Sequence, residues 1–301
     1  MAKIKILVML SLCGMAWLNV KAQQTKTVFG VAAQKTLETK EFVYKPTGKI
    51  ANLSLSIENI VAKLVIKGTS RNDILLKAED LYALPEKAKG LRSVTSQGQD
   101  NTGLTLMIKQ DGNQVKLLGT SLKRTWKATF TIEVPAAMDL SVNYEEWRAS
   151  GLKITEVDGD IEVRSTAANV LLEDVSGPIS VSSTSGDIEV KMGTIDRSAP
   201  SILSSFSGDI DLALPESAKV SLQLKGSMGE LYTDLDVKFR KVEKAAFNQQ
   251  EEKLPKASKT SSVTGYTYTG QPNKSMTADL NGGGSKLEIH TTSGNVYLRK
   301  R

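Results

Sequence analysis

The stretch GDIEVRSTAANVLLEDVSGPISVSSTSGDIEV, residues 159–190, decides the fold of this chain. It repeats one short phrase four times, as GDIEV, ANVLL, GPISV and GDIEV, with starts nine residues apart. The phrase returns as GDIDL at 208–212 and as GNVYL at 294–298. Self-similarity at a fixed short period is typical of chains built by stacking one structural unit.

Apolar and polar residues alternate in each unit, which is the pattern of a strand with one buried face. The apolar residues stand two apart and are predicted to point inward, as Ile161/Val163, Val170/Leu172, Ile179/Val181, Ile188/Val190, Ile210/Leu212 and Val296/Leu298. The residues between them are mostly polar and so mostly predicted to face solvent, with Leu171 as the exception; the others are Glu162, Ser180, Glu189, Asp211 and Tyr297.

Each strand follows a turn rich in Gly, Ser, Asp and Asn. Glycine adopts positive φ without the steric cost that a Cβ brings, so we predict that the turn glycines serve this purpose. The structural turn glycines are Gly159, Gly177, Gly186, Gly208 and Gly294. Strands of about five residues with turns of about four leave no room for a crossover helix.

Two architectures fit this spacing. In a parallel β-solenoid, two units form one coil of about eighteen residues and the coils stack at about 4.8 Å. In an antiparallel meander, the units are hairpins. Asn-Gly and Asp-Gly loops are typical of tight hairpins, whereas Gly precedes Asp here. The sequence therefore predicts an all-β fold, a parallel β-solenoid or β-helix-like repeat domain with a β-rich N-terminal part.

Residues 1–22 have the pattern of a secretory signal peptide, because Lys3 and Lys5 precede the apolar run 6–18. Cleavage is expected after Ala22. The alternative is a lipoprotein signal ending at Cys13, but Leu12 stands where a small residue is required. The expected location is the periplasm, the outer membrane or the cell exterior, and no transmembrane span is predicted after the signal.

Composition divides the rest of the chain into an N-terminal extension at 23–39, a β-rich part at 40–150 and solenoid repeats at 151–301. The stretch 236–275 is dominated by Lys, Glu, Gln and Ser and is predicted to be a polar excursion from the solenoid. The chain's last segment is expected to form the last coil, with Arg299-Lys300-Arg301 covering the open end of the stack.

Charge and cysteine content exclude several classes of function. The formal net charge falls from +6 to +3 when the three lysines of the signal are removed, and the basic residues form no concentrated stripe. Nucleic-acid binding is therefore not expected. Cys13 is the only cysteine, so a chain cleaved after Ala22 has no disulfide, thiol nucleophile or cysteine-based metal site.

Histidine and aspartate give no metal or cofactor site. His290 is the only histidine and alternates onto the outer face, so no histidine triad can be built. Asp160, Asp187 and Asp209 follow turn glycines, as in calcium-binding β-rolls, but each turn has one glycine instead of several. With eighteen residues per coil, Asp160 lies over Pro178, so we expect turn-capping aspartates that do not stack.

A carbohydrate-active enzyme on a β-helix scaffold is the alternative function. Glycoside cleavage needs two carboxyl groups about 5–9 Å apart around a cleft. Glu162 and Glu189 are predicted to face outward, and Glu145-Glu146 flank Trp147, but nothing in the sequence pairs any two of these groups. No catalytic residue is therefore predicted.

Aromatic residues are the candidate ligand contacts. Tyr144 with Trp147, and Tyr266 with Tyr268, can form flat platforms for sugars or for another protein. The competing interpretation is packing in the core or at a cap, which is favoured for Trp147.

Four stretches resemble a known bacterial family. They are EFVYKPTGKIANLSLSIEN at 41–59, IEVP at 132–135, the SGDIEV-type units and LNGGGSKLEIHTTSGNVYLRK at 280–300. They are similar to the bacterial domain of unknown function called a putative adhesin, especially to its Bacteroidetes members. The resemblance spans residues 40–301 and implies an exported solenoid-like β protein, with no catalytic residues to transfer. We expect a non-enzymatic, adhesin-like binding or scaffold protein of the cell envelope whose partner is a protein or a glycan.

Overall fold

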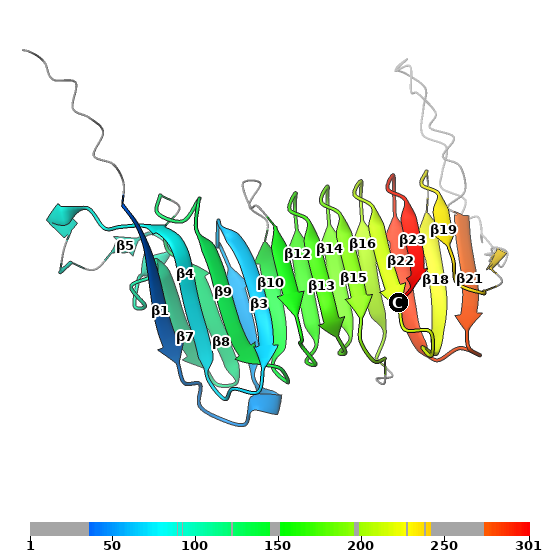
Figure 1. Ribbon diagram of the computed structural model, residues 1–301, viewed down its shortest axis with the longest axis horizontal. Coiled ribbons are helices and arrows are strands. Elements are labelled where there is room, and N and C mark those ends of the chain that lie inside the picture. The colour runs from blue at the N-terminus through cyan, green and yellow to red at the C-terminus, as the bar shows by residue number, and fades with distance from the viewer. Residues whose placement is uncertain are drawn as a thin grey trace, which may run out of the picture. The chain divides into compact units, whose positions relative to one another are not determined.

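The computed structural model describes residues 36–241 and 274–301, apart from residues 89, 92, 122, 145–150, 196–198, 227 and 238. Within Thr36–Arg301, which cluster as one unit, nearly every element is a β-strand (Figure 1). The predicted signal peptide and nearly all of the predicted excursion at 236–275 lie outside the described residues.

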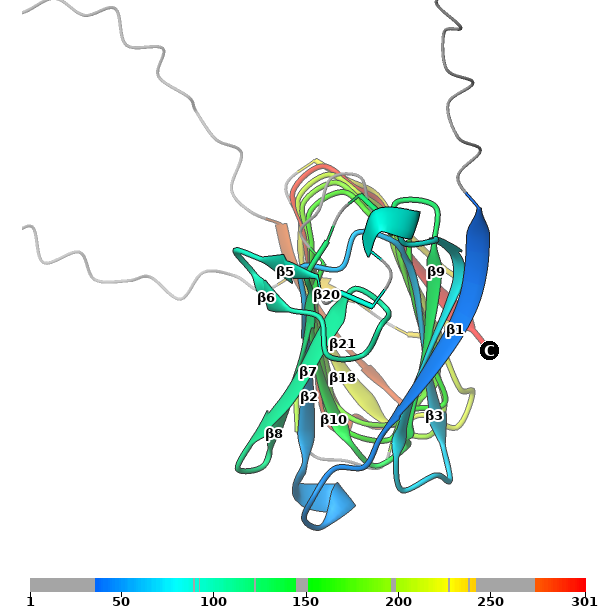
Figure 2. The ribbon, with the colours of Figure 1, turned by 90° about the vertical axis from the view of Figure 1, so that its left-hand side faces the viewer.

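The strands form two large sheets that face each other (Figure 2). Sheet 1 has the order β1 (Leu37–Tyr44), β4 (Ile74–Tyr82), β9 (Thr129–Pro135), β3 (Lys63–Thr69), β11 (Leu152–Thr155), β13 (Val170–Val175), β15 (Ile188–Met192), β17 (Ile210–Leu214), β23 (Val296–Lys300) and β19 (Leu231–Thr233). Sheet 2 has the order β20 (Arg240–Lys241), β21 (Lys274–Leu280), β18 (Val220–Gly226), β22 (Ser285–Thr291), β16 (Ser201–Ser205), β14 (Ile179–Ser183), β12 (Ile161–Ser165), β10 (Asp139–Tyr144), β2 (Ser54–Glu58), β8 (Gln114–Gly119) and β7 (Leu106–Asp111). The remaining elements are the hairpin of β5 (Val94–Thr95) with β6 (Gly98–Gln99) and two 3-10 helices, η1 (Ile50–Asn52) and η2 (Glu86–Ala88).

Each coil of the central stack contributes one strand to each sheet. β12 and β13 form one coil, and β14 and β15 form the next. Ile161 pairs with Ile179 and Val170 pairs with Ile188, so equivalent positions on these coils are eighteen residues apart. Neighbouring strands in this part are parallel, which confirms the predicted β-solenoid and excludes the meander.

The β-rich N-terminal part continues the same two sheets. β2 is parallel to β10 in sheet 2, and β3 is parallel to β11 in sheet 1. Antiparallel pairs follow at this end, where β4 joins β1 and β9, and β7 joins β8. The parallel coils are therefore bounded by hairpin-like strands on the N-terminal side.

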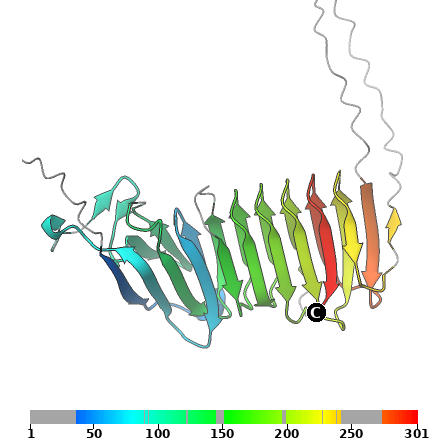
Figure 3. The same cartoon turned by 45° about the horizontal axis from the view of Figure 1, so that its top comes forward.

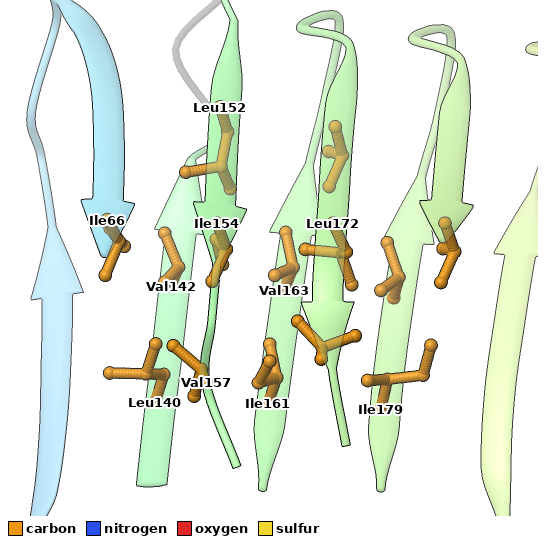
Figure 4. Close-up of a cluster of buried hydrophobic side chains, with 14 of the residues drawn as sticks. Ile66, Leu140, Val142, Leu152, Ile154, Val157, Ile161, Val163, Leu172 and Ile179 are labelled. Atoms are coloured by element: carbon orange, nitrogen blue, oxygen red, sulfur yellow. The ribbon is translucent and has the colours of Figure 1, made fainter. Parts of the chain in front are cut away.

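Apolar side chains fill the space between the two sheets (Figure 4). All twelve residues predicted to point inward are buried, each with at most 4% of its surface exposed. Leu140, Ile161 and Ile179 form one row, because they occupy paired positions on successive strands of sheet 2. Burying one such side chain contributes about 1.5–3 kcal/mol, so these rows hold successive coils together.

The last two strands of the chain do not form the last coil of the stack. β22 lies between β16 and β18, and β23 lies between β17 and β19 (Figure 3). Arg299 Nε is 2.9 Å from both carboxylate oxygens of Asp211, and Arg301 contacts Asp174. The prediction that Arg299-Lys300-Arg301 cover an open end is therefore wrong, because β18 and β19 stack beyond the C-terminal strands.

The turn glycines are needed for a different reason from the one predicted. None of the five has positive φ; they are Gly159, Gly177, Gly186, Gly208 and Gly294. Each lies directly above backbone of the neighbouring coil instead. A Cβ built on Gly177 would be 2.1 Å from Gly159 O, and one built on Gly294 would be 2.0 Å from Gly208 O. Close stacking of backbone on backbone, and not the φ angle, therefore excludes larger residues here.

Candidate functional site

Tyr144 is buried, with 1% of its surface exposed, so it is not the ligand contact that the sequence suggested. It follows Leu140 and Val142 in the inward alternation of β10. Its hydroxyl contacts the carbonyl oxygens of Ala62 and, at 3.1 Å, Gly151. The other predicted contacts, Trp147, Tyr266 and Tyr268, lie outside the described residues and stay predictions.

A row of inward-facing hydroxyl side chains, three buried and one half-buried, closes the turns that lead from sheet 2 to sheet 1. Ser165, Ser183, Ser205 and Thr291 follow Tyr144 in register. Each hydroxyl donates to the carbonyl oxygen three residues later, at 2.6–2.9 Å. Sequence analysis missed this structural row, although Ser or Thr recurs three residues before Ala168, Gly186, Gly208 and Gly294.

Asp187 and Asp209 do stack, contrary to the prediction. Ile188 pairs with Ile210, so this coil advances by twenty-two residues instead of eighteen. Asp187 Oδ1 accepts the N–H of Asp209 at 2.9 Å, and Asn169 Oδ1 accepts the N–H of Asp187 at 3.0 Å. These side chains cap the backbone of the next coil, and the described part of the chain holds no group of three or more potential metal ligands.

The outer face of sheet 2 carries a shallow groove of about 330 Å³. Ser141, Glu162 and Ser180 form part of its wall and pair across β10, β12 and β14. Pro178 and Ile202 supply an apolar part. Because the paired positions come from successive coils, the groove crosses the strands and follows the direction of stacking.

Three carboxylates lie at this groove, those of Asp139, Asp160 and Glu162. Asp139 Oδ1 accepts the N–H of Asp160 at 2.9 Å, and Glu162 forms an ion pair with Arg164 at 2.8 Å. The wall therefore combines serine hydroxyls, which donate and accept, with carboxylate oxygens, which accept. That combination suits a ligand rich in hydroxyl groups.

A second hollow, of about 270 Å³, opens two residues further along β16 on the same face. It is lined by Ser204, Ser205, Lys225, Gly226, His290, Thr291 and Thr292. Ser204 pairs with His290, and His290 pairs with Lys225, so the hollow spans β16, β22 and β18. The groove and the hollow share no lining residue but lie on neighbouring strands of sheet 2, and we call the two together the outer track.

Glu288 organises the charges beside the hollow. Its carboxylate lies 2.5 Å from Lys286 Nζ, 3.1 Å from His290 Nε2 and 3.7 Å from Lys225 Nζ. The hydrogen bonds from Lys286 and His290 lower the pKa of Glu288 to about 2. One carboxylate thus faces three basic side chains, and this end of the outer track is basic.

The outer face of sheet 1 consists of paired charges. Lys153 and Lys191 lie 2.6 and 2.9 Å from the Glu173 carboxylate, and their hydrogen bonds lower the pKa of Glu173 to about 2. Further along the sheet, the Tyr232 and Tyr297 rings stack with their centroids 5.3 Å apart. These contacts join neighbouring coils, so we place the candidate binding site on sheet 2.

The carboxylates whose pKa values are shifted, Glu173 and Glu288, do not favour acid–base catalysis. A glycosidase acid needs a raised pKa so that it carries a proton. Glu173 and Glu288 are shifted the other way, to about 2, because basic side chains hydrogen-bond to them. His290 lies on the outer face, where the alternation placed it, with Glu288 as its partner.

None of the helices in the described ranges has the length and apolar character that crossing a membrane requires.

Comparison with known proteins confirms the family resemblance. The model of the Toastrack family, DUF4097, matches residues 132–265, which include the repeats between 159 and 212. No curated protein matches the sequence.

Three solved structures are similar. A putative cell adhesion protein from Clostridium sporogenes is 10% identical, with 88% of this chain and 100% of that chain covered and a TM-score of 0.42. A putative adhesin from Bacteroides fragilis is 11% identical, with 89% and 99% covered and a TM-score of 0.27. A putative lipid binding protein from Parabacteroides distasonis is 13% identical, with 87% and 96% covered and a TM-score of 0.32. At these values the names of the three proteins do not define a ligand for this chain.

Proposed function

We propose that this chain is an exported, non-enzymatic, adhesin-like binding protein of the cell envelope, and that its outer track binds an extended glycan. The observation that carries the proposal is that the groove and the hollow lie on the same face of one sheet. Both reach β16, where Ile202 lines the groove and Ser204, two residues further along the strand, lines the hollow. A site of this form suits a long, thin ligand that lies along the stack.

The length of the track supports an extended polymer. Its lining residues come from β2, β10, β12, β14, β16, β22 and β18, which are seven neighbouring strands of sheet 2. At about 4.8 Å between strands, six spacings amount to about 29 Å. Such a length accommodates several units of a linear chain.

The lining chemistry favours a polar ligand. Hydroxyl side chains recur along the track, at Ser54, Ser141, Ser180, Ser204 and Thr292. Protein interfaces depend on buried aromatic and arginine anchors, and none of the described residues that line the groove or the hollow is Phe, Tyr, Trp or Arg. A sugar polymer, whose hydroxyl groups match these donors and acceptors, therefore suits the track better than a protein surface.

We propose export to the cell envelope on the basis of the sequence, because residues 1–22 resemble a signal peptide and the chain resembles the adhesin family. A scaffold role fits the same proposal, because a stack of coils presents one long repeated face.

A carbohydrate-active enzyme is the alternative, and the three carboxylates of the groove are the place where it would act. Against it, Asp139 and Glu162 already have partners in Asp160 and Arg164. A cleaving pair would have to release these contacts before it could take part in acid–base chemistry.

A glycan array followed by calorimetry tests the proposal. We expect the purified chain to bind linear oligosaccharides without releasing new reducing ends. Ser180→Tyr fills the groove and should abolish binding, whereas Thr155→Tyr makes the same change on the outer face of sheet 1 and should leave binding intact. Absence of binding across the array, or equal affinity in both variants, contradicts a glycan site on sheet 2; release of reducing ends would establish the enzyme instead.

A further inference from the structure

We infer that the hollow at Lys225 and His290 is a subsite for an acidic group of the glycan, a carboxylate or a sulfate, and that the ligand of the outer track is an acidic polysaccharide. This inference rests on the proposed function and specifies its ligand. It gives the track a direction, because the groove carries carboxylates at one end and the hollow carries basic side chains at the other.

Gly226 lies at the border of the hollow. It is the last residue of β18, where it pairs with Thr291. A Cβ built on Gly226 would meet only the Thr291 methyl group, at 3.6 Å, so the backbone tolerates a side chain here. The glycine is therefore not required by coil stacking, unlike the turn glycines. Its Cβ would point inward beside Thr291, on the opposite face of the strand from Lys225 and His290, so Gly226 borders the hollow with its backbone.

Charge favours an anion in this space. In the part of the chain that the structure describes, the ionisable groups facing the hollow and its border are Lys225, Lys286, His290 and Glu288. Lys286 and His290 lie within hydrogen-bonding distance of the Glu288 carboxylate, at 2.5 and 3.1 Å. Counting the two lysines against one glutamate leaves an excess of at least one positive charge.

Lys225 is the residue best placed to bind the anion. Its Nζ lies 3.7 Å from Glu288, which is beyond hydrogen-bonding distance, and 41% of its side chain is exposed. An ammonium group has three donors, so Lys225 can hold Glu288 electrostatically and still donate to a ligand. Ser204 and Thr292 add hydroxyl donors on the opposite side of the same hollow.

The carboxylates of the groove would repel an anionic group of the ligand. Asp139, Asp160 and Glu162 lie four or more strands away from Lys225 in sheet 2. An acidic group bound in the hollow therefore avoids these like charges. The neutral, hydroxyl-bearing part of the polymer then occupies the groove.

The test compares two forms of one polymer, oligogalacturonate and its methyl ester, which differ in the charge of the carboxyl group. The same calorimetry is repeated with a sulfated oligosaccharide and its unsulfated parent. We expect an acidic member to bind about tenfold more tightly than its neutral counterpart, the effect of one charge-assisted hydrogen bond. Added salt should reduce the difference.

Matched variants assign the effect to the hollow. Lys225→Gln should remove the preference for the acidic form, and Lys225→Arg should retain it. Lys63→Gln makes the same change of charge on the exposed outer face of sheet 1 and should leave the preference unchanged. Thermal melting of all three variants checks that the fold persists.

The outcomes separate the two proposals. Equal binding of acidic and neutral forms, still blocked by Ser180→Tyr, overturns the acidic subsite and leaves the glycan track standing. No binding of either form to the chain overturns both. Binding to phosphatidylglycerol vesicles, without binding to any acidic oligosaccharide, would assign the hollow to a lipid headgroup and overturn the inference as stated.

Discussion

Gly208 lies on Gly186 of the neighbouring coil so closely that a Cβ on Gly208 would be 2.2 Å from the Gly186 carbonyl oxygen. The same overlap recurs where Gly294 lies on Gly208. Real side chains do not approach backbone this closely, so a larger residue forces the coils apart at the turn. The same turn contains the hydrogen bond from Asp209 N–H to Asp187, and this bond would lengthen as the coils move apart.

Gly208→Ala should therefore destabilise the protein by about 3 kcal/mol, at the upper end of the usual cost of overpacking. Gly226→Ala is the matched control, because its Cβ would have an ordinary contact at 3.6 Å. Urea unfolding of both variants measures the difference. Similar stability of the two would show that the turns separate without cost and that stacking does not select glycine.

Glu173 predicts a dependence of stability on pH. Its pKa is lowered from the ordinary 4.5 to about 2, chiefly by hydrogen bonds from Lys153 and Lys191. A carboxylate with a lowered folded-state pKa stabilises the fold above its unfolded pKa, and this contribution is lost as pH falls through the folded pKa. Glu173→Gln should thus lower stability at pH 7, and the gap to the parent chain should close between pH 4.5 and about 2.

Chemical unfolding at a series of pH values measures that gap. Glu216→Gln, at an exposed turn carboxylate, is the control and should show no such gap. A gap for Glu173→Gln that stays constant down to pH 2 would mean that the two lysines do not stabilise the charged form.

The row of Asn169, Asp187 and Asp209 predicts that an amide side chain can replace a carboxylate at these positions. Each side-chain oxygen accepts a backbone N–H of the next coil, and Asn169 does so as well as the aspartates. Asp209→Asn should leave the melting temperature nearly unchanged, whereas Asp209→Ala should cost about 1 kcal/mol for the lost hydrogen bond.

Chelation tests the same row. Because the aspartate oxygens are engaged by backbone N–H groups, EDTA should not shift the melting temperature. A fall of several degrees that calcium restores would identify the row as a metal site and reject its role as a backbone cap.

The inserted position of the C-terminal coil predicts the effect of truncation. β22 and β23 separate β16 and β17 from β18 and β19. Deleting residues 285–301 should therefore release β18 and β19 as well, since their parallel partners are gone. Deleting only residues 299–301 removes the contacts to Asp211 and Asp174 and should cost much less.

Hydrogen exchange of the truncated chains measures this effect. Amides of β18 and β19 should lose protection when 285–301 are absent, while those of β12 to β15 keep it. Retained protection in β18 would show that this coil joins β16 directly once the inserted coil is removed.

The family resemblance, the two-sheet coil and the choice of inward residues could all be predicted from the sequence. Ile188 and Val190 are buried and Glu189 is exposed because side chains alternate along any strand, a rule that needs no knowledge of neighbours. The prediction for Tyr144 went wrong because this rule was not applied to it. Its aromatic ring suggested a ligand platform, although its place after Leu140 and Val142 already indicated the core.

Only the tertiary structure decided which segments become neighbours. Backbone hydrogen bonds between parallel strands are alike in every coil, so the pattern of Leu287 and Ile289 could not show that β22 enters between β16 and β18. The stacked carboxylates of Asp187 and Asp209 depend on one longer coil, and the hollow depends on Lys225 meeting His290 from a segment sixty-five residues away. The sequence by itself determined which side chains each strand buries, because the alternation of side chains is a local property of a strand. The fold decided which side chains lie together on each outer face, because that depends on the register between coils.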